Sequence, residues 1–204
     1  VPGNALLTSD FVTKATGNFT NGAIWQYNNE GAGFVDALQA PSADNNVNIQ
    51  AAHTVALDAG FVINTGKTIT VNGTLNCGTN TVSGAGSFVT AAASTLGIGS
   101  TAGITASGAS GNIQTTTRTF SSSGNYTYNG AANQAAGNGL PAGINNLVVA
   151  NTGAAANNIV SLSGSLTVNG SSTLGSGVLS IGSNTLTLNG AVSGSGTLTG
   201  TASG

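Results

Sequence analysis

A short motif recurs along this chain, and it constrains the fold more than any other feature. It occurs at residues 68–73 (TITVNG), 165–170 (SLTVNG) and 185–190 (TLTLNG), and the last two copies start 20 residues apart. Polar and aliphatic residues alternate in each copy, which predicts a strand with one buried face. The Asn-Gly pair that follows readily adopts positive φ and predicts a tight turn at the end of each strand.

The spacing of these repeats favours one architecture. Residues 75–82 (LNCGTNTV) also match residues 179–186 (LSIGSNTL). Short strands and Gly-rich corners that recur about every 20 residues are typical of a solenoid. We therefore predict an all-β chain folded as a parallel β-helix with coils of about 20 residues. Asn-Gly pairs also suit hairpins, so an antiparallel β-sandwich is the alternative fold.

The composition of the chain changes near residue 67. Residues 1–67 hold seven of the eight charged side chains, and we interpret them as an N-terminal cap-like or first-coil segment. Residues 68–204 are repetitive and are predicted to form the β-solenoid. Their one charged side chain, Arg118, has no acidic residue near it in the sequence, so we expect it to be solvated.

This composition argues against several classes of function. Charged residues make up 4% of the chain, and three basic residues are too few to neutralise nucleic-acid phosphates. No apolar run of about 18 residues predicts membrane insertion. Hydrophobic residues reach 39%, which argues against disorder. We expect a protein that is not an enzyme and that has no catalytic residues, no metal and no cofactor.

A few residues could nevertheless carry chemistry. His53 precedes Asp58 and could act as a base or a metal ligand, but we interpret it as a strand residue on the same side as Val55. Cys77 aligns with Ile181 in the longer match, which predicts a buried thiol. A glycosidase pair or a calcium site would need carboxylates, which we interpret as solvated turn residues. These carboxylates are Asp10, Glu30, Asp36, Asp44 and Asp58.

Three aromatic residues, Trp25, Tyr27 and Phe34, lie within ten positions of each other. We expect them to pack as a cap over the first coil, because aromatic side chains bury large areas. They are also the candidate residues for an assembly contact or a glycan contact. Separately, Thr-x-Thr pairs at 68/70, 185/187 and 197/199 suggest ice binding as a lesser alternative, against ordinary strand threonines.

Several stretches resemble large secreted repeat proteins of Bacteroidota. They are residues 17–19, 24–25, 40–41, 46–49, 53–55, 68–75, 111–116, 126–130, 134, 139–141 and 145–147. The resemblance implies a secreted protein, extracellular or on the cell surface and often adhesin-like. It supplies no catalytic residues. No folded sorting domain is recognised at the C-terminus, so we expect either a fragment or a processed product.

The expected function is structural. Residues 191–200 still follow the repeat pattern, and an uncapped solenoid end presents an unpaired strand edge that invites another chain. We therefore expect an extracellular filament or adhesive stalk in which identical subunits assemble head to tail. Residues 1–7 are a candidate partner for the last coil. The alternative is a carbohydrate-binding module or a polysaccharide-active β-helix enzyme that contacts surface glycans.

Overall fold

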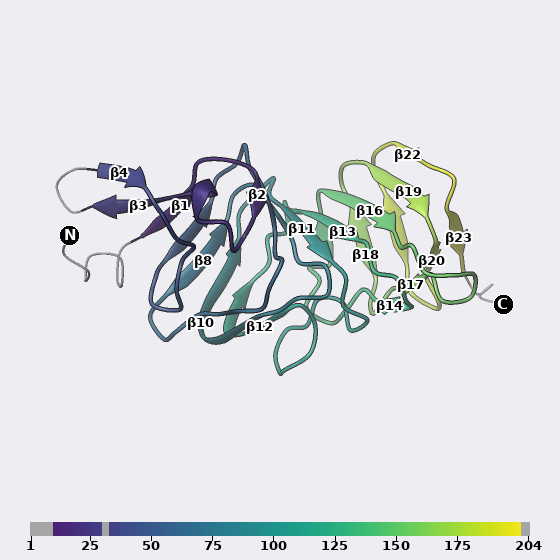
Figure 1. Cartoon of the computed structure of the whole chain (residues 1–204). Coiled ribbons are helices and arrows are strands. Elements are labelled where there is room, and N and C mark those ends of the chain that lie inside the picture. The colour runs from purple at the N-terminus through teal and green to yellow at the C-terminus, as the bar shows by residue number, and fades with distance from the viewer. Residues whose placement is uncertain (1–9, 30–32, 201–204) are drawn as a thin grey trace.

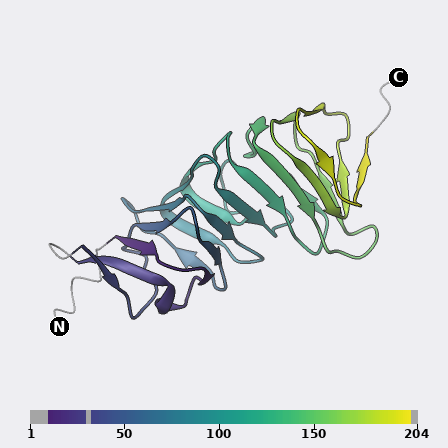
Figure 2. The same ribbon diagram turned by 90° about the horizontal axis from the view of Figure 1, so that it is seen from above.

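The computed structural model describes residues 10–29 and 33–200. These residues form an elongated stack of short strands, with the two chain termini at opposite ends (Figures 1 and 2). Apart from one 3₁₀ turn, η2 (Gly22–Ile24), the elements described are strands. The predicted all-β class is confirmed.

Sheet A lies in the half of the stack nearer the N-terminus and contains strands from both sides of residue 67. In their order across the sheet its strands are β12 (Ile113–Thr119), β10 (Val82–Thr90), β8 (Thr68–Val71), β5 (Val47–Ile49), β1 (Phe11–Thr13), β3 (Trp25–Asn29) and β4 (Gly33–Asp36), with β7 (Phe61–Val62) beside β10.

Sheet B runs along the whole stack and joins its two halves (Figure 1). Its eight strands are β2 (Gly17–Asn18), β6 (Thr54–Ala56), β9 (Thr74–Asn76), β11 (Thr95–Ile98), β13 (Asn125–Tyr128), β16 (Asn146–Ala150), β19 (Ser172–Ser176) and β22 (Val192–Ser193). They follow one another in chain order, so each strand pairs with the strand of the preceding layer.

Sheets C and D lie in the other half of the stack. Sheet C contains β14 (Gln134–Ala135), β17 (Ile159–Ser161), β20 (Val178–Ser180) and β23 (Thr197–Thr199), and sheet D contains β15 (Gly143–Ile144), β18 (Leu166–Val168) and β21 (Leu186–Leu188). From β13 onward the chain visits sheets B, C and D in a repeating order.

Parallel pairing dominates all four sheets. Within the described ranges, the antiparallel pairs are β1 with β3 and β3 with β4, at the N-terminal end of sheet A. The other strand pairs are parallel. The antiparallel sandwich that we considered from the sequence does not fit this pairing.

The core consists of aliphatic and aromatic side chains that stack from one strand to the next. On sheet B the buried column is Val55, Leu75, Leu96, Tyr126 and Leu147, which pair in register. Because strand residues alternate between faces, each column places identical positions about 4.8 Å apart and buries them continuously.

The strand register predicted from the repeat is confirmed. Leu166 pairs with Leu186 and Val168 pairs with Leu188, both in parallel. At the strand end, the Asn189 side-chain amide donates to Oδ1 of Asn169 over 3.1 Å, so equivalent asparagines stack at equivalent corners. These contacts join residues 20 positions apart, which is the spacing of the repeat.

The glycines of the Asn-Gly pairs have a different role from the one that we predicted. Neither Gly73 nor Gly190 has a positive φ. A Cβ atom on Gly73 would lie 2.1 Å from the Gln50 carbonyl oxygen, and one on Gly190 would lie 2.1 Å from that of Gly170. Glycine is therefore required because successive corners stack too closely for a side chain.

Candidate functional site

The three aromatic residues expected to form a cap lie on the antiparallel strands β3 and β4 of sheet A. The Trp25 side chain is entirely buried and its Nε1 donates to the Phe19 carbonyl oxygen over 2.9 Å. The Phe19 ring packs edge-on against Trp25 at 5.1 Å and also contacts Phe61 at 4.7 Å. Trp25 is therefore a packing residue. Its ring has no exposed area with which to make an assembly or glycan contact.

The other two aromatic candidates are more exposed. Tyr27 is half-buried and its ring lies 6.1 Å from that of Phe11. Phe34, on the edge strand β4, is 47% exposed, which is unusual for a large apolar side chain in this molecule. Of the three candidates, Phe34 alone presents much of its ring to solvent.

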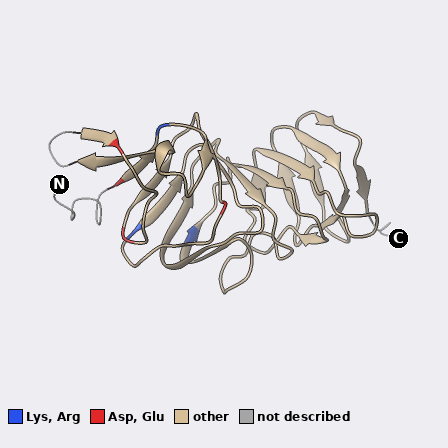
Figure 3. Ribbon diagram, viewed as in Figure 1, with Lys and Arg blue, Asp and Glu red and all other residues tan. Residues whose placement is uncertain are grey.

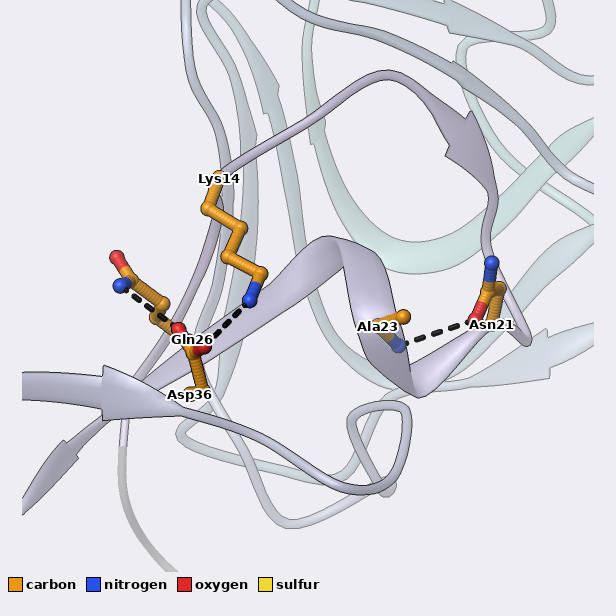
Figure 4. A network of polar contacts seen from close by, with 5 residues as sticks. All are labelled: Lys14, Asn21, Ala23, Gln26 and Asp36. Carbon is orange, nitrogen blue, oxygen red and sulfur yellow. Dashed lines mark hydrogen bonds and ion pairs between the residues drawn. The ribbon is translucent and has the colours of Figure 1, made fainter.

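A polar network holds β4 against its neighbours (Figure 4). Asp36 accepts from Gln26 Nε2 over 3.1 Å and forms an ion pair with Lys14 at 2.7 Å. Hydrogen bonds from Lys14 and Gln26 lower the pKa of the Asp36 carboxyl. Asn21 caps η2 by accepting from the Ala23 amide over 3.0 Å. Since Asp36 lies two residues after Phe34, this network also fixes the strand that carries the exposed ring.

A groove of about 480 Å³ lies on sheet A, between Phe34 on its edge strand β4 and strands β1, β5 and β8. Its lining residues come from four strands and the residues that precede two of them: Asp10, Phe11, Val12, Phe34, Asn46, Val47, Asn48, Thr68 and Thr70. Sequence reasoning identified Phe34 but missed the asparagines and threonines, because they are distant in the sequence and are brought together by strand pairing. Asn48 and Thr70 alternate with aliphatic residues in the sequence, and this alternation could have indicated that both side chains lie on the outward face of their strands.

The His53 and Asp58 side chains are each bound to another partner. The Nδ1 atom of half-buried His53 lies 2.8 Å from Thr13 Oγ1. The Asp58 carboxylate accepts from the amide and the hydroxyl of Thr20, and the hydroxyl contact lowers the pKa of Asp58. These contacts tie the segments around β2 and β6 together.

Cys77 is completely buried, as its alignment with Ile181 predicted. Burial raises the pKa of its thiol to about 12. A thiolate is the nucleophilic form of cysteine, so this side chain is unreactive at neutral pH and acts as a small core residue.

The expectation that Arg118 is solvated is wrong. Arg118 pairs with buried Phe88, and its guanidinium donates to the carbonyl oxygens of Thr105, Gly108 and Thr115. Its contact with Thr105 Oγ1 is 2.7 Å long. Burial lowers the pKa of the guanidinium. Arg118 therefore holds the long loop between β11 and β12 against the last strand of sheet A.

Figure 3 shows that the charged residues among those described lie in the half of the stack nearer the N-terminus. Glu30 falls outside the described residues. The described residues contain no cluster of three or more His, Cys, Asp or Glu side chains that could bind a metal ion. They also contain no helix with the length and apolarity needed to cross a bilayer.

Comparisons of the chain with protein-family models, with curated proteins and with solved structures find no match.

Proposed function

We propose that this protein is an extracellular structural protein: a β-solenoid subunit of a filament or of an adhesive cell-surface stalk. The observation that carries the proposal is the parallel, in-register stacking of short strands along the whole molecule. The repeating passage of the chain through sheets B, C and D supports the reading as a solenoid. Stacked coils resist bending because every layer is hydrogen-bonded to the next.

The use of side chains supports a structural role over catalysis. The candidate groups His53, Asp58, Cys77 and Arg118 are engaged in contacts that hold segments together or are buried in the core. An extracellular location agrees with the buried thiol, which is protected from oxidation in an oxidising environment. The resemblance to secreted repeat proteins points the same way.

Assembly would use the strand edges at the C-terminal end of the stack. In the described part of the chain, β21, β22 and β23 each pair with one neighbour. Val192 and Leu198 in these strands are 54% and 46% exposed. Unpaired strand edges beside exposed apolar side chains favour the addition of a further strand layer. We propose that a second copy of this chain supplies that layer. Residues 1–7, the candidate partner segment, lie outside the described residues.

Ice binding has weaker support than a structural role. An ice-binding face needs regularly repeated threonines. On sheet B the outward column runs through Thr54, Thr74 and Thr95 but continues with Asn125 and Asn146. The outward residues of this column are therefore threonines in one half of the stack and asparagines further along.

Sedimentation velocity and electron microscopy test the assembly proposal. The wild-type chain should form particles much larger than one subunit, and these should persist at about 1 M salt, where the Debye length is about 3 Å. Leu198→Asp should reduce them to monomers, since a charge would be placed at the stacking edge. Leu38→Asp is the matched control, because Leu38 is 97% exposed and follows β4, which lies at the opposite end of the stack from β23. Wild-type monomers at all concentrations, or particles that dissolve in salt, would contradict the proposal.

A further inference from the structure

We propose that the groove on sheet A between Phe34 of β4 and strands β1, β5 and β8 binds a neutral saccharide. The groove is the one part of the described surface where a large exposed aromatic ring faces several polar side chains. Its volume of about 480 Å³ is within the range of small-ligand sites, which is about 300–1,000 Å³.

The floor of the groove is a regular polar surface. Asn48 pairs with Thr70 across β5 and β8, while their neighbours Val47 and Ile69 point into the core. Strand alternation therefore places the amide and the hydroxyl side by side on the outer face. The strands beneath are fully paired in sheet A, so these groups sit on a rigid base.

One side of the groove is fixed by internal hydrogen bonds. Asn46 Nδ2 donates to Asp10 Oδ1 over 2.9 Å, and Asn46 Oδ1 accepts from the Thr68 amide over 2.9 Å. Asn46 is therefore satisfied and positions its neighbours. The Asn48 amide also accepts from Asn72 through its oxygen, at 2.7 Å, which directs the nitrogen and its two donor hydrogens elsewhere.

Several polar atoms of the groove remain available for a ligand. They have no intramolecular partner within the described ranges, and they are Asn48 Nδ2, the hydroxyls of Thr68 and Thr70, and Asp10 Oδ2. The set contains a donor, an acceptor and two groups that can do both. Sugar hydroxyls both donate and accept, so adjacent hydroxyls of a pyranose match this mixture.

Phe34 supplies the apolar part of the recognition. A pyranose ring has an apolar C–H face that packs flat against an aromatic ring, and aromatic rings offer a large, rigid contact area. The strand that carries the ring is already held in place, because the Asp36 network ties β4 to β3 and to Lys14. Binding would thus cost little ordering of the site.

The charge of the groove selects the class of saccharide. Asp10 is the one charged residue in its lining, and no Lys or Arg lines it. The nearby Lys14 is paired with Asp36. A sulfated or uronic-acid polymer would meet an uncompensated carboxylate, whereas a neutral sugar would use Asp10 as a hydrogen-bond acceptor. The site is independent of the assembly proposal, since it lies at the opposite end of the stack from Leu198.

Affinity electrophoresis tests this proposal, with gels that contain laminarin, xyloglucan or galactomannan as neutral probes and alginate as the anionic probe. The wild-type chain should be retarded by at least one neutral polymer and not by alginate. Phe34→Ala should weaken that retardation about tenfold or more, as expected for an aromatic anchor of a binding site. Asn48→Ala should weaken it to a smaller extent.

Two controls make the outcome decisive. Leu38→Ala removes an exposed apolar side chain outside the groove and should bind as the wild type does. Thermal unfolding of Phe34→Ala should match the wild type, which separates lost binding from lost folding. No retardation by any neutral polymer, unchanged binding by Phe34→Ala, or preferential binding of alginate would overturn the proposal. Particle size in the same samples reports on assembly alone.

Discussion

Both halves of the molecule contain strands with alternating buried and exposed residues, but the strands at the two ends of the stack differ. The N-terminal half ends in the antiparallel strands β3 and β4, of which β3 begins with the buried Trp25, and it holds the charged residues that the structure describes. The C-terminal half is built from sheets B, C and D, and its last strands leave Val192 and Leu198 exposed. Among the described residues, one end of the stack carries antiparallel strands, and at the other end β21, β22 and β23 each pair with one neighbour.

This difference predicts that the position of a strand layer in the stack decides how much each repeated residue contributes to stability. A layer inside the stack pairs with neighbours on both sides, whereas β21 to β23 pair on one side in the described structure. Stability in such a stack is the sum of each coil and its interfaces. Identical motifs are therefore expected to respond differently to the same substitution.

The largest contrast is expected between Cys77→Asp and Ile181→Asp. The two positions are equivalent in the repeat, but Cys77 is fully buried and Ile181 is half-buried. An unpaired charge in the core should cost about 3–5 kcal/mol at Cys77 and clearly less at Ile181, where water can reach the carboxylate. Chemical denaturation measures both. Equal losses of stability would show that burial does not differ between the two halves.

The Asn-Gly corners provide a second matched pair. Gly73→Val should destabilise the fold by several kcal/mol, because its Cβ would collide with the carbonyl oxygens of Gln50 and His53, at 2.1 and 2.4 Å. Gly190→Val meets the Gly170 carbonyl at 2.1 Å, but Gly190 is exposed in the last coil, which can move away. Thermal unfolding should show a smaller change there. A larger effect at Gly190 would contradict this ranking.

Arg118 lies on β12, the last strand of sheet A, and its replacement tests whether it holds the loop between β11 and β12 in place. Arg118→Ala should cost about 1–3 kcal/mol, because several carbonyl oxygens would lose a charged donor. Hydrogen exchange at the Ile104 amide, which bonds to Ala136 in the next layer, should become faster. Arg118→Lys should rescue the loop only in part, since an ammonium lacks the planar fork. Unchanged exchange in Arg118→Ala would show that the loop holds without it.

The smallest expected effect is a dependence on pH that is confined to the N-terminal half. The folded-state pKa values of Asp36 and Asp58 are lowered by hydrogen bonds, so their stabilisation is complete above the unfolded pKa of aspartate and is lost as the pH falls through the folded values. Both groups are highly exposed, so the effect is weak. NMR in acid should show loosening around β2 and β4, with β18 and β20 unchanged. Equal loosening of both halves would argue against a local origin.

Much of the fold could be predicted from the sequence because its repeats are local. The alternation in residues 165–170 and 185–190 predicted the strands, their parallel register and the stacking of Asn169 with Asn189. The alignment of Cys77 with Ile181 predicted a buried thiol. These features follow from side-chain periodicity and from the interval of about 20 residues between repeats, both of which can be read from the amino-acid sequence.

The tertiary structure alone decided the direction of Arg118 and the existence of the groove. Strict alternation from buried Ile113 and Thr115 would point Arg118 outward, but the pairing of β10 with β12 shifts register between Gly84 and Ser87 and places Arg118 opposite the core residue Phe88. A bulge of this kind reverses which face a residue occupies. The groove likewise depends on strand order, because its polar groups come from segments up to sixty positions apart. Periodicity therefore determines which residues form strands, while pairing across the sheet determines which residues meet.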